Sequence, residues 1–197
     1  MKTSEEVCNK LKTLGINFEV ITFTDEVIAA REKDTSVDHN YDPKNAIKTL
    51  VIKTKDGFMA VVLKGSEKID GQLLENIVGK WSVVDEDTLF DEFGFVPGTV
   101  CPLVLDIPIV VDENVLNQDV WSMGTGEIKK GFNVKKDEVI KVLKFETAKI
   151  SGKIEKFSDE TVTKFKLITR NCQEVLVSED LKTLVESEKP INHYIGF

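Results

Sequence analysis

The sequence is poor in the residues that build disulfide frameworks and metal centres. Its 197 residues include three cysteines, Cys8, Cys101 and Cys172, and two histidines, His39 and His193. The cysteines are odd in number and far apart, so they fit neither a disulfide framework nor a zinc-ligand spacing. His-x-x-x-His and His-Glu-x-x-His patterns are also missing, which disfavours a zinc hydrolase. We therefore expect no metal and no other cofactor.

Signals for a serine hydrolase and for membrane insertion are equally scarce. The sequence holds no Gly-x-Ser-x-Gly elbow, and we interpret His193 as a surface or packing residue. No stretch approaches the roughly 18 apolar residues that a membrane helix needs. Residues 1–6 lack the apolar segment of a secretion signal. We expect a cytoplasmic protein that contacts neither membrane nor DNA.

The charge is acidic overall but unevenly distributed. The net charge is -8 and the pI is about 5.0, which argues against strong nonspecific binding of nucleic acid. Residues 129–166 nevertheless carry eleven lysines against six acidic residues, a balance of +5. Two interpretations stay open for this segment. It forms either a positive face that holds phosphates or a solvated charged surface.

Hydrophobic periodicity predicts short helices and strands over residues 1–145. Thr3 and Glu6 fit a capping box for a helix over 4–14, and Asp56-Gly57 predicts a hairpin between two β-rich runs. The predicted helices cover 4–14, 70–78, 85–93 and 136–144, with a short one near 25–32. The predicted strands cover 17–23, 48–53, 58–63, 81–84, 120–123 and 132–134, and the apolar runs 103–105 and 107–111 are joined by a turn at Asp106.

Residues 146–197 differ from the preceding residues in their pattern of predicted elements and form a C-terminal extension. Strands are predicted at 149–157, 161–168 and 173–177, followed by a helix over 178–186. The segment is too β-rich and apolar to be disordered.

Along the whole chain, strands and helices do not alternate in a regular βαβ rhythm, which indicates an α+β class with a mixed, largely antiparallel sheet and short helices packed around it. We expect a domain over 1–145 and a β-rich extension over 146–197.

Two short motifs, fifty residues apart, carry the strongest functional signal. Lys48-Thr49-Leu50 opens a strand, where an ammonium can bind a phosphate or a carbonyl oxygen. Gly98-Thr99-Val100-Cys101-Pro102 is a loop whose glycine lets a ligand approach the backbone, and whose N–H groups can bind an oxyanion or a water. Taken alone, the lysine is a solvated strand-end residue and the loop is a structural turn.

Together and in this order, the motifs resemble the YbaK/ProX family of aminoacyl-tRNA deacylases, which is related to the editing domain inserted in some prolyl-tRNA synthetases. The resemblance covers residues 3–145 and implies a YbaK-like fold with Lys48 and Gly98 as catalytic residues. It implies that the loop backbone positions the water and the substrate carbonyl. Cys101 is expected to shape a pocket, because no histidine is placed to activate its thiol. The other loop residues are assigned to substrate binding: Thr99, Val100, Cys101 and Pro102.

Further pocket residues follow from the same resemblance. The segment 122–126 resembles a glycine-bearing loop that lines the family's pocket through Gly124 and Gly126, although a plain glycine turn fits as well. Asp112 resembles a recurrent family aspartate that binds substrate. The alternative is a turn or helix cap.

Two positions depart from the family pattern. Phe23 stands where some relatives carry a tyrosine, and Asn133 stands where some carry an acid. Both residues are assigned to the substrate pocket. The departures put the amino-acid specificity in doubt more than the reaction.

The resemblance implies a trans-editing hydrolase that cleaves mischarged aminoacyl-tRNA, with proline-specific tRNA carrying alanine or cysteine as the favoured substrate. A hydrophobic pocket discriminates poorly between amino acids that differ by one methylene, which is why a separate hydrolytic site is needed to remove the wrong one. The implied partners are aminoacyl-tRNA and an aminoacyl-tRNA synthetase. Two alternatives stay open. One is a non-catalytic module of this fold that binds tRNA or a synthetase, and the other is an interaction protein without a tRNA role.

Overall fold

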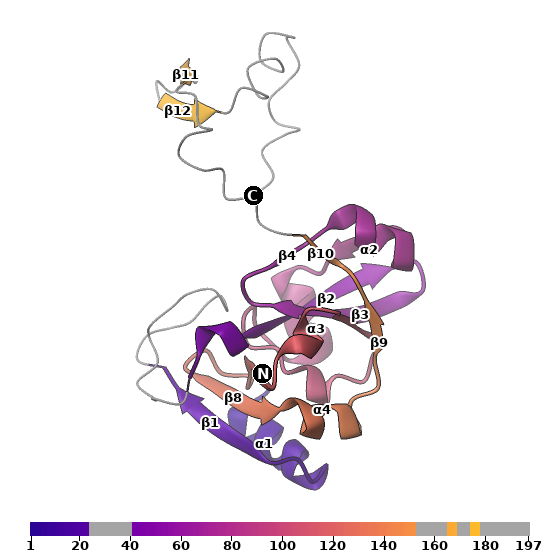
Figure 1. The fold of residues 1–197 in the computed structure, drawn as a ribbon, viewed down its shortest axis with the longest axis vertical. Coiled ribbons are helices and arrows are strands. Elements are labelled where there is room, and N and C mark those ends of the chain that lie inside the picture. The colour runs from indigo at the N-terminus through magenta and orange to yellow at the C-terminus, as the bar shows by residue number, and fades with distance from the viewer. Residues whose placement is uncertain (24–40, 153–164, 169–173, 178–197) are drawn as a thin grey trace. The chain divides into compact units, whose positions relative to one another are not determined.

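The computed structural model describes residues 1–23, 41–152, 165–168 and 174–177, and the chain divides into two units, Met1–Lys153 and Ile154–Phe197. In its described part, the first unit holds two main sheets with short helices around them (Figure 1). This arrangement confirms the predicted α+β class. No helix among the described residues is long and apolar enough to cross a membrane.

The four α-helices of the described part begin at, or one residue after, the predicted starts. They are α1 Ser4–Thr13, α2 Gly71–Val78, α3 Glu86–Phe93 and α4 Lys136–Val142. Thr3 and Glu6 form the expected capping box on α1. Asp70 and Asp85 accept backbone N–H groups at the starts of α2 and α3. A side-chain cap therefore fixes the start of α1, α2 and α3, whereas α4 has no such cap and is held by its buried Val139.

A five-stranded mixed sheet forms the centre of the first unit. Its order is β5 Trp81–Val83, β2 Ile47–Thr54, β3 Gly57–Lys64, β6 Ile109–Asp112 and β9 Glu146–Ala148. β2 and β3 form the predicted hairpin, with Thr54 opposite Gly57. β6 runs parallel to both β3 and β9. The last strand was not predicted, and it adds residues beyond 145 to this sheet.

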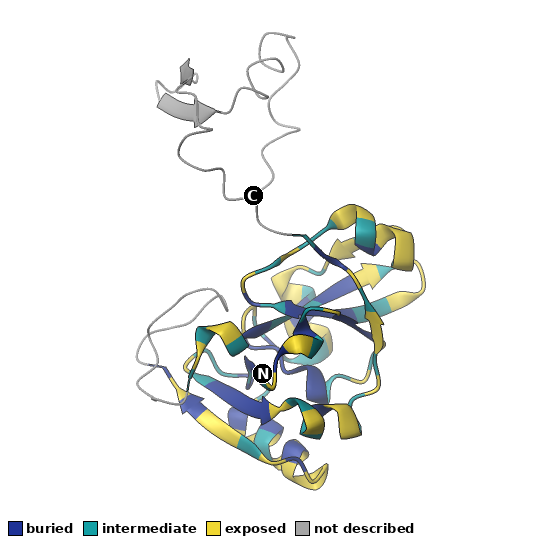
Figure 2. Cartoon of the chain, viewed as in Figure 1, coloured by how far each residue is buried: buried dark blue, intermediate teal, exposed yellow. Residues whose placement is uncertain are grey.

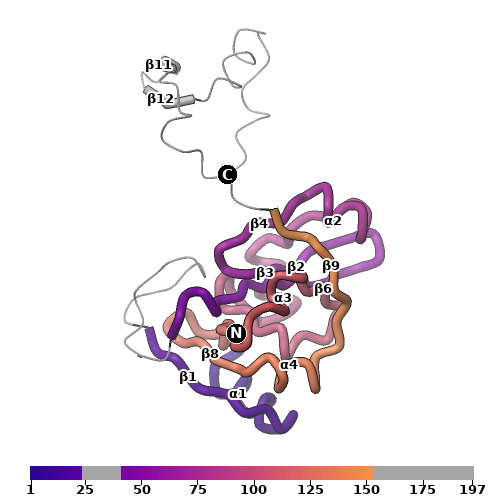
Figure 3. Tube along the Cα trace, viewed as in Figure 1, coloured from indigo at the N-terminus to yellow at the C-terminus, as the bar shows by residue number. Residues whose placement is uncertain are grey.

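A second, antiparallel sheet lies against the first. Its order is β1 Phe18–Thr22, β8 Lys130–Lys135 and β7 Val120–Gly124. β1 and β8 are far apart in sequence but lie side by side (Figure 3). A parallel bridge between Ala46 and Ser122 connects the start of β2 to β7. The two sheets therefore meet where the predicted glycine-bearing loop begins.

Buried residues gather along the central strands (Figure 2), and the apolar side chains of the hairpin divide between its two faces. Ile47 and Val51 belong to the larger core with Phe95, Trp121 and Phe132, all buried. The next residues along β2 face the other way, because side chains alternate along a strand. Leu50 and Ile52 accordingly pack into a smaller core. This alternation decides where the side chain of Lys48 goes.

Several short elements differ from the predictions or lie outside the described residues. The run 103–105 begins in a 3-10 turn, η2 Pro102–Val104, because a proline opens it. The other unpredicted elements are η1 Pro43–Asn45, η3 Val115–Asn117 and β4 Lys68–Ile69, which pairs with β10 Ser151–Gly152. The helix near 25–32, the helix over 178–186 and most of the strand 149–157 lie outside the described residues. In the second unit, β11 Phe165–Ile168 pairs with β12 Glu174–Val177.

Candidate active site

The predicted glycine loop begins with a tight turn. Thr99 donates its backbone N–H to the Val96 carbonyl over 3.1 Å, and its hydroxyl donates to the same oxygen over 2.9 Å. Pro97 precedes Gly98, whose φ is +82°. Proline followed by a glycine with positive φ is the pattern of a type II turn, in which another residue would be strained. Stiffness at this bend comes from Pro97 and Thr99 as well as from Pro102.

The end of β7 packs directly against this turn. A Cβ atom on Gly124 would lie 2.3 Å from the Thr99 carbonyl carbon and oxygen, so no larger residue fits there without a shift of the backbone. Gly126 donates its N–H to the Thr99 carbonyl over 2.9 Å and has a φ of +90°. The structure thus brings the two predicted glycine segments into contact.

A small cavity of about 50 Å³ lies beside this contact. It brings together Phe23, Gly98 and Gly124 from the predicted site. Its described lining is mostly apolar or backbone: Ile21, Phe23, Tyr41, Ala46, Ile47, Gly98, Ser122, Met123, Gly124, Ile128, Lys130 and Gly131. Tyr41, Ile128 and Lys130 were not predicted for the site. Nothing in the local sequence marks Tyr41 or Ile128, whereas Lys130 belongs to the lysine-rich segment 129–166.

An aromatic pair forms one wall of the cavity. The rings of Phe23 and Tyr41 meet edge to face, with 5.2 Å between centroids and 89° between planes. Gly131 leaves room for the Phe23 ring, since a Cβ there would lie 3.2 Å from that ring. Burial raises the pKa of the Tyr41 phenol, so Tyr41 stays protonated at neutral pH. The phenol ring of Tyr41 thus forms part of the cavity wall.

A polar pair, Ser122 and Asn133, links the cavity to a second groove. Both residues are buried and stand opposite each other on β7 and β8. The Ser122 hydroxyl donates to Oδ1 of Asn133 over 2.5 Å. Ser122 lines the cavity, whereas Asn133 lines the neighbouring groove with Asn17 and Asn45. Asn133 touches the cavity lining through its hydrogen bond with Ser122, and its direct contact with substrate stays a prediction.

The rest of the predicted loop lies behind the cavity wall. Thr99, Val100, Cys101 and Pro102 are all buried. The Cys101 sulfur lies 3.8 Å from the sulfur of Met123, which lines the cavity. Burial raises the pKa of the Cys101 thiol to about 12, so this residue is not a thiolate at neutral pH. Its position fits support of the wall and does not fit nucleophilic attack.

Lys48 follows Ile47, but its side chain leaves the strand on the other face. Among the described residues, the cavity lining does not include Lys48. Its ammonium donates to the backbone carbonyl of Glu67, in the segment after β3. The structure therefore does not bring the Lys48 ammonium to the bend at Gly98. A role of Lys48 in binding substrate stays a prediction from the family resemblance.

Asp112 holds two segments of backbone together. It is fully buried at the end of β6 and accepts backbone N–H groups from Asn114, Ile150 and Ser151 over 2.9, 2.8 and 2.7 Å. A carboxylate with three such donors closes a turn and fastens a neighbouring segment. This geometry matches the turn alternative, while substrate binding by Asp112 stays a prediction.

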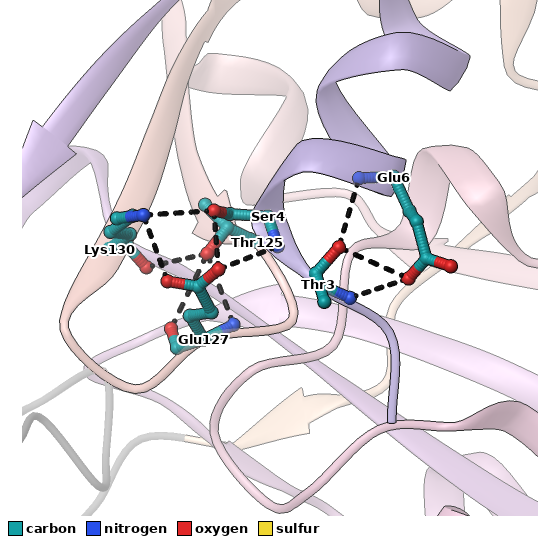
Figure 4. A network of polar contacts seen from close by, with 6 residues as sticks. All are labelled: Thr3, Ser4, Glu6, Thr125, Glu127 and Lys130. Carbon is teal, nitrogen blue, oxygen red and sulfur yellow. Dashed lines mark hydrogen bonds and ion pairs between the residues drawn. The ribbon is translucent and has the colours of Figure 1, made fainter.

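A charged network connects the cavity rim to the first helix (Figure 4). Lys130 lies 2.9 Å from Oε2 of Glu127 and donates to the Ser4 hydroxyl over 3.1 Å. Glu127 accepts the backbone N–H and the hydroxyl of Ser4 over 3.0 and 2.6 Å. The Ser4 hydroxyl and the Lys130 ammonium lower the pKa of Glu127 to about 2. The N-terminal end of α1 therefore fixes the segment that carries Lys130.

Metal ligation has no support in the part of the chain that the structure describes. No group of three or more His, Cys, Asp or Glu side chains there is arranged to hold a metal ion. Both histidines, His39 and His193, lie outside the described residues. The described cavity therefore offers backbone groups, one hydroxyl, one phenol and one ammonium for chemistry.

Comparison with known proteins decides the family. The pattern of the aminoacyl-tRNA editing domain matches residues 27–142, more than half of the chain. The chain belongs to the aminoacyl-tRNA editing domain family. The matched region contains both predicted motifs and most of the described cavity. The predicted resemblance to the editing deacylases is thereby confirmed.

A curated relative and two solved structures agree with this assignment. The proline–tRNA ligase of Desulfotalea psychrophila is 27% identical over 95 residues, which are 47% of this chain and 16% of that synthetase. A structure named as a candidate trans-editing enzyme for prolyl-tRNA synthetase has 18% identity and a TM-score of 0.66, over 76% of this chain and 96% of that one. The hypothetical protein APE2540 has 19% identity and a TM-score of 0.65, over 74% and 99%. The two structures share the fold.

Proposed function

We propose that this member of the editing family hydrolyses the ester bond of mischarged aminoacyl-tRNA, acting in trans on proline-specific tRNA that carries alanine or cysteine. Family membership supports an editing role. The named trans-editing neighbour and the prolyl-tRNA ligase relative favour a proline-specific tRNA. Aminoacyl-tRNA, and through it a synthetase, would be the partner.

The cavity is the observation that carries this proposal. Its volume of about 50 Å³ is small, and Gly98, Gly124 and Gly131 bring backbone close to the space. On this measure about 10–15 Å³ already holds one water, so the cavity has room for a small group such as a methyl or thiol. In the proposal, the glycine backbone around this space limits the size of the amino-acid side chain that enters.

Backbone groups supply the chemistry in this proposal. The Gly98 N–H has no hydrogen-bond partner among the described residues, so it is available to a ligand at the turn. A water attacks the ester carbon, and the carbonyl oxygen becomes an oxyanion that this N–H stabilises. The oxyanion then re-forms the carbonyl as the carbon–oxygen bond to the ribose breaks, and the ribose oxygen takes the proton that the attacking water gives up. One such donor contributes about 3 kcal/mol to the transition state in other enzymes.

Lys48 enters the proposal through the family resemblance. Its ammonium would bind the acceptor-end phosphate or the substrate carbonyl after exchanging the Glu67 carbonyl for the substrate. With the phosphate, that exchange replaces a neutral acceptor by an anionic one, which strengthens the hydrogen bond. The proposal thus separates two roles, a cation for binding and the turn at Gly98 for the reaction.

A deacylation assay on a panel of mischarged tRNAs tests this function. We expect cleavage of alanyl or cysteinyl esters on proline-specific tRNA, and little cleavage of the cognate prolyl ester. Gly98→Ala and Lys48→Ala should each reduce the rate by about tenfold or more. Lys53→Ala, which removes an exposed lysine of β2, is the control. Absence of cleavage, or full activity of Lys48→Ala, overturns the proposal, and tRNA binding without cleavage would indicate the non-catalytic module.

A further inference from the structure

Lys130 is the one charged residue in the described lining of the cavity. The other described lining residues are apolar, glycine, serine or a protonated tyrosine. The side chain of Lys130 is 40% exposed, so its ammonium stands toward the solvent side of this space. A cation beside an uncharged cavity suits a ligand with a small apolar group and an anionic oxygen next to it.

The contacts of Lys130 fix its position and leave capacity for a ligand. A lysine ammonium has three N–H donors. In the described part of the chain, two of them are directed at Glu127 and at the Ser4 hydroxyl, over 2.9 and 3.1 Å. The Glu127 carboxylate also accepts two groups of Ser4 at the start of α1, so its negative charge is shared with that helix end. The third donor of Lys130 remains for a bound anion.

We propose that Lys130 binds an anionic oxygen of the acceptor end of aminoacyl-tRNA beside the cavity. This inference rests on the proposed function. When the amino-acid side chain fills the apolar space, the oxygen-rich part of the substrate lies outside it, where the ammonium stands. The oxygen has two sources with the same chemistry. One is the phosphate on the 5′ side of the terminal nucleotide, and the other is the oxyanion that forms on the ester carbonyl.

Short substrates separate these sources. The experiment compares alanyl-adenosine with its 5′-phosphorylated form, using wild type, Lys130→Gln, Lys130→Arg and the control Lys53→Ala. Glutamine removes the charge, but its amide N–H groups can still donate to Glu127 and to the Ser4 hydroxyl, as Lys130 does, which preserves the network. We expect Lys130→Gln to lower kcat/KM by about tenfold or more on the phosphorylated substrate, and arginine to restore much of it. Lys53→Ala should match wild type.

The pattern of the loss identifies the source. A higher KM that appears only with the phosphorylated substrate assigns the phosphate. A lower kcat on both substrates assigns the oxyanion. Unchanged kinetics of Lys130→Gln on both substrates overturn the proposal.

A binding measurement keeps this inference distinct from the proposed function. If the wild type cleaves no substrate, the proposed function fails and only the phosphate remains as a source. Calorimetry with 5′-AMP and adenosine on the wild-type protein then decides the case. Tighter binding of 5′-AMP, with the preference lost in Lys130→Gln, supports the site. Equal binding of the two compounds overturns it, and this result needs no variant to fold.

Discussion

Gly124 occupies the tightest backbone contact of the site. A methyl group at this position would lie 2.3 Å from the Thr99 carbonyl, far inside van der Waals contact. We expect Gly124→Ala to lower the free energy of unfolding by about 3 kcal/mol, because either β7 or the turn at Gly98 must move. It should also abolish deacylation, since the same movement deforms the cavity. Urea unfolding and the ester assay measure the two effects.

Gly71→Ala is the matched control for that substitution. A Cβ on Gly71 would meet Trp81 at 3.9 Å, an ordinary contact, and Gly71 is the first residue of α2. Its stability should stay within about 1 kcal/mol of wild type. Equal stability of the two variants would contradict the close packing of β7 on the turn.

Cys101 illustrates how burial sets the chemistry of one residue. With a thiol pKa of about 12, on the order of one molecule in ten thousand carries the thiolate near pH 8. We therefore expect Cys101 to remain unmodified by a thiol reagent in the native protein, while the partly exposed Cys8 reacts. Peptide mapping by mass spectrometry identifies the labelled residue. Labelling of Cys101 as fast as Cys8 under native conditions would show that the thiol is accessible.

At the scale of one element, the start of α1 is bonded to the segment 125–130 through Glu127. The pKa of this carboxyl is lowered from 4.5 to about 2, mainly by the Ser4 hydroxyl and Lys130. A lowered pKa means that the ionised form stabilises the fold, fully above about pH 4.5. This contribution is lost as the pH falls from about 4.5 to about 2. Glu127→Gln should therefore destabilise the protein near neutral pH and much less near pH 2.

Urea unfolding of both proteins across this pH range measures that contribution. Glu5→Gln is the control, because it removes an exposed carboxylate from the same helix turn without touching Glu127. A stability difference between wild type and Glu127→Gln that does not change with pH would contradict the assigned role of the network.

Local signals explain which elements the sequence predicted well. The capping box at Thr3, the cap at Asp85 and the hairpin at Asp56-Gly57 depend on residues a few positions apart, so they are visible in the sequence. β9 is three residues long and exists because β6 offers it an edge. Nothing in Glu146-Thr147-Ala148 marks such a strand. Elements such as β9 depend on tertiary contacts and not on a local sequence pattern.

The same division applies to the candidate site. Gly98 and Gly124 were predicted from motifs, and both lie at the cavity. Tyr41 and Lys130 join it only because β1, β7 and β8 assemble beside the start of β2, which no local pattern encodes. Strand alternation does place Ile47 and Lys48 on opposite faces. Which of these faces borders the cavity is decided by the packing of β7 and β8, so the sequence alone could not tell that the lysine leaves the cavity side.

For the whole molecule, the connection between residues 146–152 and the main sheet determines where the chain can be shortened. β9 pairs with β6, and Ile150 is fully buried in the smaller core. Asp112 takes two of its three backbone donors from Ile150 and Ser151. We expect residues 1–153 to fold cooperatively, and residues 1–145 to be less stable by at least about 4 kcal/mol or insoluble. The loss combines the burial of Ile150 with a buried carboxylate deprived of donors.

Thermal and urea unfolding of the two truncated proteins test this difference, and tRNA binding by residues 1–153 tests the role of the remainder. Asp112→Asn in the full chain is the companion variant, because it keeps the chain length and disturbs only the carboxylate. It should cost about 2 kcal/mol, whereas Asp85→Asn, at an exposed cap where asparagine serves equally well, should cost little. Equal stability of the two truncated proteins would place residues 146–152 outside the folded core and assign the whole C-terminal stretch to another task, such as docking tRNA.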